Sequence, residues 1–66
     1  MELRSLKYLI AVAGAGSISR AAQELHMTQP PLSAAIAQLE QELGSRLFHR
    51  TSRGVTLTAT GQYLLR

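Results

Sequence analysis

Apolar residues recur at helical spacing in the middle of the chain, where they define its clearest predicted element. Four of them follow at steps of four, three and four residues: Leu32, Ile36, Leu39 and Leu43. This spacing places them on one face of a helix. Thr28 stands at an N-cap position, where its hydroxyl can accept a free backbone N–H, and Pro30 and Pro31 fall in the first turn, which tolerates proline. We therefore predict a helix over 28–43 with these four residues in the core.

The opposite face of this helix carries no charge and little bulk. It consists of Pro30, Ser33, Ala34, Ala37, Gln38 and Gln41. A helix face that is merely solvated usually carries Lys and Glu. Small residues with hydroxyl and amide groups can approach another surface closely and still exchange hydrogen bonds with it. This face is therefore predicted to lie against a partner.

A second, shorter helix is predicted just before it. Gly16 can end the preceding element, and Ser17 can cap the new helix. Three residues of this helix are expected to face inward: Ala21, Ala22 and Leu25. Small alanines allow two helices to cross closely, as a helix-turn-helix requires. His26 and Met27 then form the turn, with Met27 buried beneath it.

The chain begins with another predicted helix, over 1–13, which the sequence Gly-Ala-Gly at 14–16 ends. Its inward stripe is predicted to consist of Leu3, Leu6, Ile10 and Ala13, with Leu9 beside it. Arg4 and Lys7 fall on the outer side, and we expect Lys7 to be simply solvated.

Residues 47–57 have the pattern of a β-hairpin. Gly44 gives the long helix a left-handed stop, and β-prone runs then flank the turn sequence Thr-Ser-Arg-Gly at 51–54. A two-stranded hairpin is marginal alone, so it must lean on the helices. Its expected inward anchors are Phe48, Val55 and Leu57. Arg50 and Arg53 give its tip the densest charge of the chain.

Thr58 is predicted to cap a last helix that runs to the end of the sequence. Gly61 weakens this helix locally, and the apolar run at its end indicates that the natural protein continues. The predicted fold is mainly α with a small β-hairpin, that is, a winged helix-turn-helix over 1–57. The segment 58–66 would begin a further helix.

Composition limits the possible classes of function more than it limits the possible folds. The chain has 66 residues and 45% apolar content, which suits one small folded domain, and its net charge is +3 with a pI of about 10.2. This modest basic excess is compatible with a polyanion partner. There is no cysteine, and His26 and His49 have no partner at ligand spacing, so no metal site is expected. No membrane-spanning run or secretory leader is evident, so we expect a cytoplasmic location and no membrane association.

Catalytic chemistry finds no support in the sequence. No carboxylate pair, Cys/His couple or phosphate-binding loop is present, and Ser33 has no companion base, so we do not expect an enzyme. One alternative is a winged-helix protein-interaction module without DNA binding, which should expose aromatic or bulky apolar anchors. The long helix and the hairpin tip instead carry small polar residues and arginines, which favours a nucleic acid.

The residue types on these two elements suit double-stranded DNA. A glutamine amide such as that of Gln29 offers a donor and an acceptor together, which matches the N7/N6 edge of adenine in the major groove. A helix N-terminus adds a positive dipole and free N–H groups that can face phosphate. Arginines on a hairpin tip suit a narrow A·T-rich minor groove. Two other interpretations stay open: Arg53 could be solvated, and Arg50 could pair with Glu40 or Glu42 or support the hairpin structurally.

Three motifs occur in one order and spacing along the chain. They are A-A-x-x-L-H-x-T-Q-P-P-L-S from residue 21, I-A-Q-L-E-Q-E-L-G-S-R-L-F-H-R from residue 36, and G-V-T-L-T at 54–58. With them the chain resembles, from Leu3 to Leu65, the N-terminal domain of LysR-type transcriptional regulators. The resemblance implies the winged helix-turn-helix DNA-binding domain of a bacterial transcription factor, with its helix-turn-helix motif at Ile18 to Gln38.

The resemblance also implies which residues contact DNA. Together with the physical arguments above, it gives a predicted DNA-binding set: Ser17, Ser19, Thr28, Gln29, Pro30, Pro31, Ser33, Gln38, Arg50 and Arg53. The helix over 28–43 would enter the major groove, and the wing over 50–54 would reach the minor groove through Arg53. Many family members carry an arginine after the serine of T-Q-P-P-L-S. Here Ala34 and Ala35 follow, so base reading shifts to the two glutamines, the wing and DNA shape.

Regulators of this family pair two subunits through a long linker helix and sense a small-molecule inducer with a C-terminal domain. The resemblance implies that 58–66 is the truncated start of the linker and that the effector-binding domain is absent from this sequence. No cofactor is therefore expected in this domain. The full-length protein is expected to bind double-stranded DNA as a homodimer, with a tetramer as the alternative.

Overall fold

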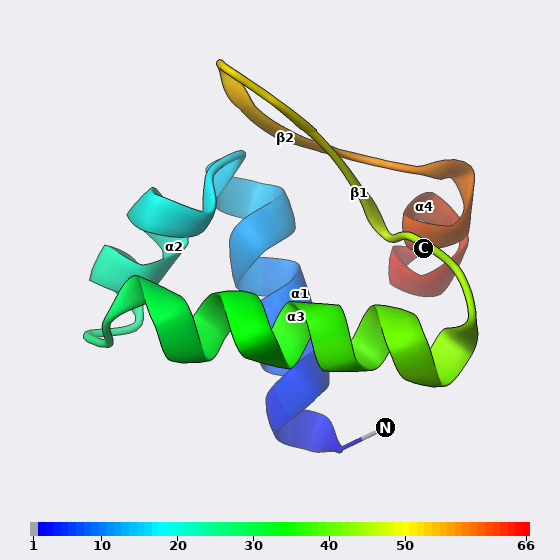
Figure 1. The fold of residues 1–66 in the computed structure, drawn as a ribbon, viewed down its shortest axis with the longest axis horizontal. Coiled ribbons are helices and arrows are strands. Elements are labelled where there is room, and N and C mark those ends of the chain that lie inside the picture. The colour runs from blue at the N-terminus through cyan, green and yellow to red at the C-terminus, as the bar shows by residue number, and fades with distance from the viewer. Residues whose placement is uncertain (1) are drawn as a thin grey trace.

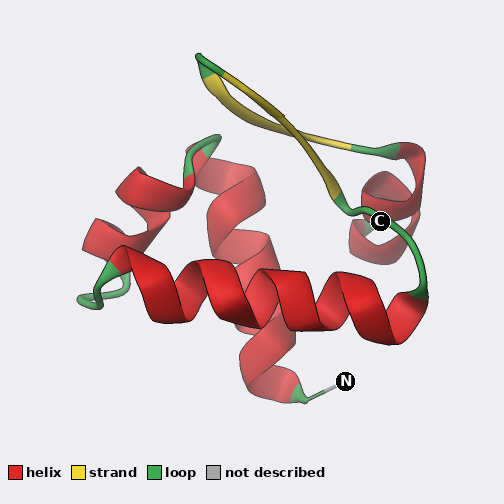
Figure 2. Ribbon diagram, in the orientation of Figure 1, coloured by secondary structure: helices red, strands yellow, loops and turns green. Residues whose placement is uncertain are grey.

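Four helices and one two-stranded antiparallel hairpin make up the part of the chain that the computed structural model describes, residues 2–66. They follow in the order α1 (Leu3–Ala15), α2 (Ile18–Glu24), α3 (Gln29–Leu43), β1 (Phe48–Thr51), β2 (Gly54–Leu57) and α4 (Ala59–Leu65). Helix α3 crosses α1, while α2 packs beside both (Figure 1). The hairpin projects along one side of the helices, with α4 at its base (Figure 2). The architecture is the predicted winged helix-turn-helix.

The helix boundaries between α1 and α2 follow from two neighbouring residues. Gly16 takes a left-handed conformation, with φ 70°, and its N–H donates to the carbonyl of Val12 at 2.9 Å. Ser17 then caps α2, because its Oγ accepts the N–H of Arg20 at 3.2 Å. Both roles were predicted, although α1 runs two residues further than the expected end at 13. Met1, which the prediction included, lies outside the described residues.

The predicted inward stripe of α1 is wrong at two of its four positions. Leu3 is 85% exposed and Ile10 is 54% exposed, whereas Leu9 and Val12 are completely buried. Leu6 and Ala13 are only partly buried at the edge of the core. The sequence left the phase of this helix open because every residue from 8 to 13 is apolar or aromatic. Packing against α2 and α3 then selects the face that carries Leu9 and Val12.

Helix α3 packs as predicted along most of its length. Leu32, Ile36 and Leu39 are fully buried, but Leu43 is 40% exposed, which corrects the expected fourth core position. The last buried side chain of α3 is instead that of Glu40, one turn earlier. Ala21 and Ala22 of α2 are buried against this core as expected, and Leu25 and Met27 are partly buried.

Thr28 occupies the N-cap position of α3, with φ −79° and ψ 160°, but its side chain makes no capping hydrogen bond. The predicted role of its hydroxyl is therefore wrong. An N-cap side chain accepts from the backbone N–H two or three residues later. Those positions are Pro30 and Pro31, which have no N–H to donate.

The hairpin pairs in the register Phe48↔Leu57, His49↔Thr56, Arg50↔Val55 and Thr51↔Gly54, with Ser52 and Arg53 as the two turn residues. Phe48 is fully buried, and Val55 and Leu57 are partly buried, as predicted. Leu47, which was not among the expected core residues, is also fully buried.

Glu40 attaches the base of the hairpin to α3. Its Oε2 accepts the N–H of Leu47 at 2.8 Å and the N–H of Phe48 at 3.3 Å, and the Nε of Arg46 lies 3.5 Å away. In the alternative interpretation, Arg50 pairs with Glu40 or Glu42. That interpretation is wrong, because within residues 2–66 the one ion pair joins Glu40 to Arg46, and Arg50 pairs with neither glutamate.

Thr58 caps α4 and also ties it to the hairpin. Its Oγ1 accepts the N–H of Gly61 at 3.1 Å and donates to the carbonyl of Arg46 at 2.7 Å. Gly61, expected only to weaken the helix, is buried so tightly that a β-carbon there would lie 2.5 Å from the Leu47 carbonyl oxygen. Its lack of a side chain therefore permits the contact between α4 and the hairpin base. None of the helices within residues 2–66 combines the length and hydrophobicity that a bilayer crossing requires.

Candidate nucleic-acid interface

The outer face of α3 is open to solvent along its length. Its exposed members are Thr28, Gln29, Pro30, Pro31, Ala34, Ala37, Gln38 and Gln41, and Ser33 is half-buried at its edge. None of these residues is charged: Glu40, on the hairpin side, is buried, and the exposed Glu42 lies at the other edge, beside Pro31 and Gln38. A helix with so little bulk can enter a groove about 12 Å wide, which is the width of the DNA major groove.

Five of the ten predicted DNA-binding residues meet around one hollow of about 330 Å³. They are Ser17, Ser19, Gln29, Arg50 and Arg53. The N-terminal end of α2, the first turn of α3 and the outer half of the hairpin supply them, so residues far apart in sequence share one concave surface. Arginines are the only charged side chains in its lining, which makes the hollow electropositive.

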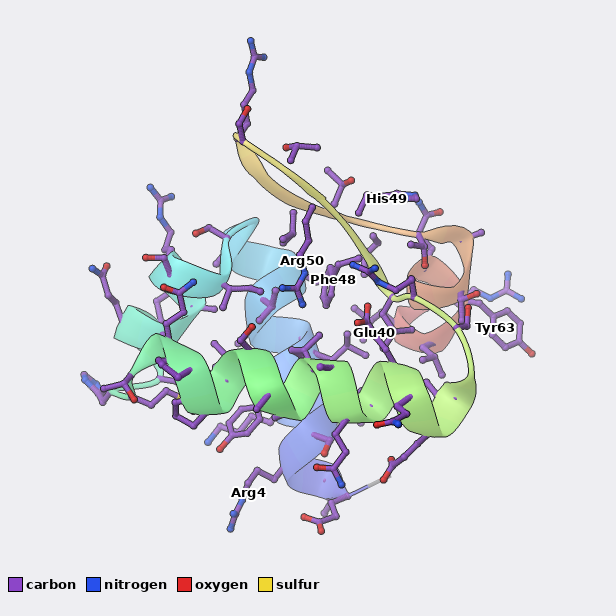
Figure 3. All side chains as sticks on the ribbon, in the orientation of Figure 1. Arg4, Glu40, Phe48, His49, Arg50 and Tyr63 are labelled. Carbon is purple, nitrogen blue, oxygen red and sulfur yellow. The ribbon has the colours of Figure 1, made fainter. Side chains whose placement is uncertain are left out.

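The hairpin divides its side chains between two faces, as strands do. Arg50 is directed from the hairpin toward α3 (Figure 3), which agrees with its place in the lining of the hollow. His49, the preceding residue, therefore belongs to the other face of β1. Arg53 is exposed at the turn. Thr51 holds this turn in shape: its Oγ1 accepts the N–H of Arg53 at 3.2 Å and lies 3.3 Å from the carbonyl of Gly54, to which it donates.

Two other predicted residues, Pro31 and Gln38, lie on the opposite flank of α3. They line a separate hollow of about 320 Å³ between α3 and the start of α1, together with Arg4, Glu2 and Glu42. Charges of both signs surround this second hollow, unlike the first. The structure therefore separates Gln38 and Pro31 from the arginine-lined surface, while Thr28, Pro30 and Ser33 lie on α3 between the two.

The N-terminus of α3 has fewer free backbone N–H groups than a helix N-terminus usually has. The first four N–H groups of a helix have no partner within it, and such groups can bind anions. Two of those positions are the prolines at 30 and 31, which carry no N–H. Side chains rather than the helix terminus must therefore make most of the contacts at this end of α3.

Two features of the site went unrecognised in the sequence. Glu40 fixes the hairpin base, and its position four residues after Ile36 on the buried face was a signal that the sequence did contain. The contact of Gly54 with Gly16 had no such signal, because the two residues meet only in the folded chain. Among the described residues, no three His, Asp or Glu side chains gather in a way that could hold a metal ion.

Comparison with known proteins decides the family. The model of the family described as "Bacterial regulatory helix-turn-helix protein, lysR family" matches residues 3–62. The chain belongs to the LysR family. Its predicted membership is thus confirmed, and so is the winged-helix fold.

Several curated relatives of this LysR-family chain are named transcriptional regulators. The chain is 54% identical over 65 residues to the HTH-type transcriptional regulator TfdT of Cupriavidus pinatubonensis, covering 98% of this chain and 28% of TfdT. It is 55% identical over 65 residues to ClcR of Pseudomonas putida and to AlsR of Bacillus subtilis, covering 98% of this chain and 22% of each relative. The chain therefore spans about a quarter of the length of these relatives.

Solved structures of similar domains include complexes with DNA. A crystal structure of the CbnR DNA-binding domain with DNA superposes with a TM-score of 0.95 at 49% identity, covering 98% of this chain and 75% of that chain. The complex of the BenM DNA-binding domain with catB site 1 DNA gives a TM-score of 0.93 at 47% identity, covering 97% of this chain and 72% of that chain. These likenesses concern CbnR and BenM, and they extend over nearly the whole LysR-family chain described here.

Proposed function

We propose that this chain is the sequence-specific DNA-binding domain of a LysR-type transcriptional regulator, with α3 in the major groove and the hairpin at the minor groove. One observation carries the proposal: serine hydroxyls, a glutamine amide and two arginines from three separate elements line one electropositive hollow beside the uncharged face of α3. The DNA complexes of CbnR and BenM, at 49% and 47% identity, support it.

Each group in the hollow has a distinct part in the proposed complex. The amide of Gln29, at the first turn of α3, reads adenine through paired hydrogen bonds, which discriminates by about 1–3 kcal/mol. Ser17 and Ser19 donate hydroxyl hydrogen bonds to phosphate and so fix the register without reading sequence. Arg53 enters a narrow minor groove, where A·T-rich DNA has an enhanced negative potential. Arg50, directed toward α3, neutralises a phosphate between the two grooves.

The protein-docking alternative lacks anchors at this surface. Within residues 2–66 the large apolar side chains that stand exposed are Leu3, Ile10, Leu43 and Tyr63. None of them lines the hollow. Interfaces between proteins rely on a few buried aromatic or bulky anchors, and the outer face of α3 and the hairpin tip present small residues and arginines. The observations at this surface therefore favour DNA.

The same proposal extends to the longer protein of which this domain would be part. We propose that residues 1–57 form the DNA-binding domain and that 58–66 begin the linker helix. A further C-terminal domain would sense a small-molecule inducer. The regulator would act as a homodimer or tetramer in the bacterial cytoplasm and would have no catalytic activity. The names of the curated relatives as transcriptional regulators support this extension.

Fluorescence anisotropy with labelled duplexes tests the proposal. A selection from a random duplex pool first supplies a preferred sequence, and binding is then measured on that duplex and on a scrambled one at two salt concentrations. The preferred duplex should bind more tightly, and both affinities should fall steeply as salt rises, because phosphate contacts release counterions. Absence of binding to every duplex, or binding that does not respond to salt, would contradict the proposal.

A further inference from the structure

The outer half of the hairpin touches the helices through one backbone contact. The N–H of Val55 donates to the carbonyl oxygen of Gly16, in the turn between α1 and α2, at 3.0 Å. Figure 1 shows this turn next to the outer half of the hairpin. The hairpin register explains why this N–H is available. Thr51 pairs with Gly54 next to a two-residue turn, so the following pair, Arg50 with Val55, is one whose N–H groups point away from the ladder.

Glycine at position 54 is what allows the two segments to approach so closely. A β-carbon built on Gly54 would overlap the carbonyl oxygen of Gly16. Gly54 also has φ 133°, a conformation that side chains with a β-carbon rarely adopt. We refer to the Gly16 carbonyl, Gly54 and the Val55 N–H together as the clasp.

The clasp joins two parts of the lining of the hollow, the hairpin turn and the N-terminal end of α2. Gly54 directly follows Arg53, and Gly16 directly precedes Ser17, the N-cap of α2. The hairpin is also attached at its base, where Glu40 holds Leu47 and Phe48, and through Val55 and Leu57, which pack against the core. A two-stranded hairpin has little stability of its own, so without the clasp its outer half would depend for its position on the base and on the partly buried Val55 side chain.

We propose that Gly54 is a positioning residue for DNA binding, because the clasp holds Arg53 at the distance from Gln29 at which both reach one duplex. This inference rests on the proposed function. A hairpin already held in its bound orientation loses less freedom when the complex forms, which strengthens binding without adding a contact. Opening the clasp should therefore remove the contribution of Arg53 while leaving that of α3.

Gly54→Ala tests the inference, with Gly44→Ala as its matched control. Gly44 also has a positive φ, of 66°, but an added β-carbon there meets nothing within 4 Å and lies away from the hollow. Gly54→Ala should weaken binding to a preferred duplex with A·T-rich flanks about tenfold, which corresponds to about 1.4 kcal/mol. It should also abolish the preference for A·T-rich over G·C-rich flanks. Gly44→Ala should retain both the affinity and the preference.

A double mutant separates positioning from general damage. If Gly54 acts through Arg53, adding Arg53→Ala to Gly54→Ala should weaken binding less than twofold further, whereas Arg53→Ala alone should weaken it about tenfold. Full additivity, wild-type binding by Gly54→Ala, or no effect of Arg53→Ala would overturn the inference and leave the proposed function standing. Failure of the unmutated chain to bind any duplex would remove both.

Amide hydrogen exchange supplies an independent measurement if Gly54→Ala does not fold, which circular dichroism would show. In the unmutated chain the amide of Val55 should exchange as slowly as those of the hairpin ladder, because Gly16 accepts its hydrogen bond. Exchange as fast as that of the exposed turn residue Ser52 would show an open clasp and would overturn the inference.

Discussion

Removal of the Glu40 carboxylate should loosen the hairpin from the helices. One oxygen, Oε2, accepts two buried backbone N–H groups, those of Leu47 at 2.8 Å and Phe48 at 3.3 Å. A buried donor that loses its partner costs about 1–3 kcal/mol, so Glu40→Ala should destabilise the chain by about 3 kcal/mol after partial relief by water. For a chain of this size that corresponds to a fall in melting temperature of roughly 12–24 °C.

Thermal and urea unfolding of three variants would measure this effect. Glu40→Gln keeps an acceptor oxygen and loses only the charge, so it should cost about 1 kcal/mol. Arg46→Ala should cost less than about 1 kcal/mol, because the Arg46 side chain is 66% exposed and solvent screens its pairing with Glu40. Glu42→Ala, at an exposed position of the same helix, is the control and should be nearly neutral. Equal destabilisation by Glu40→Ala and Glu42→Ala would refute the assigned role of the buried carboxylate.

Three further substitutions have defined outcomes. Gln29→Ala should weaken binding to the preferred duplex by about 1–3 kcal/mol in anisotropy titrations and leave the scrambled duplex unaffected, whereas equal loss on both would exclude base reading. Arg53→Ala should lower the salt dependence of log K by about one unit of slope and lose most affinity on A·T-rich flanks, and an unchanged slope would argue for a solvated arginine. His26→Gly should raise stability by about 1 kcal/mol in urea unfolding, because His26 has φ 56°, and a lower midpoint would contradict this reasoning.

The elements of this chain could be predicted where local chemistry decides them. Gly16, Ser17, Gly44 and Thr58 end or begin helices through their own backbone conformation or side-chain oxygen, and the structure confirms each. The spacing of Leu32, Ile36 and Leu39 likewise fixes the buried face of α3, because only small or polar residues separate them.

Prediction failed where the answer depends on tertiary packing. The apolar run over 8–13 allows several phases of α1, and only contact with α2 and α3 selects Leu9 and Val12. One further failure was local instead: Thr28 makes no capping hydrogen bond because Pro30 and Pro31 have no N–H to donate, which the sequence did show.

The candidate site, too, could be predicted from the sequence only in part. Residue types and the family resemblance gave ten candidates, and the structure brings five of them together around one hollow. The DNA contacts of all ten stay predictions. No local pattern could show that Gly54 would meet Gly16, because 37 residues, 17–53, lie between them along the chain. Close backbone approaches of this kind appear only when the whole fold is known.

The packing of Gly61 against the Leu47 carbonyl has a mechanical consequence. Because Gly61 has no side chain, its backbone packs directly on the Leu47 carbonyl, and Thr58 is bonded to both segments, so these contacts set the angle at which α4 departs. Each residue added to α4 would extend the helix by about 1.5 Å in that direction. A tilt of a few degrees at Gly61 would thus become a displacement of several ångströms at the far end of a long helix. Conversely, a twist applied to that far end would be transmitted to the base of the hairpin.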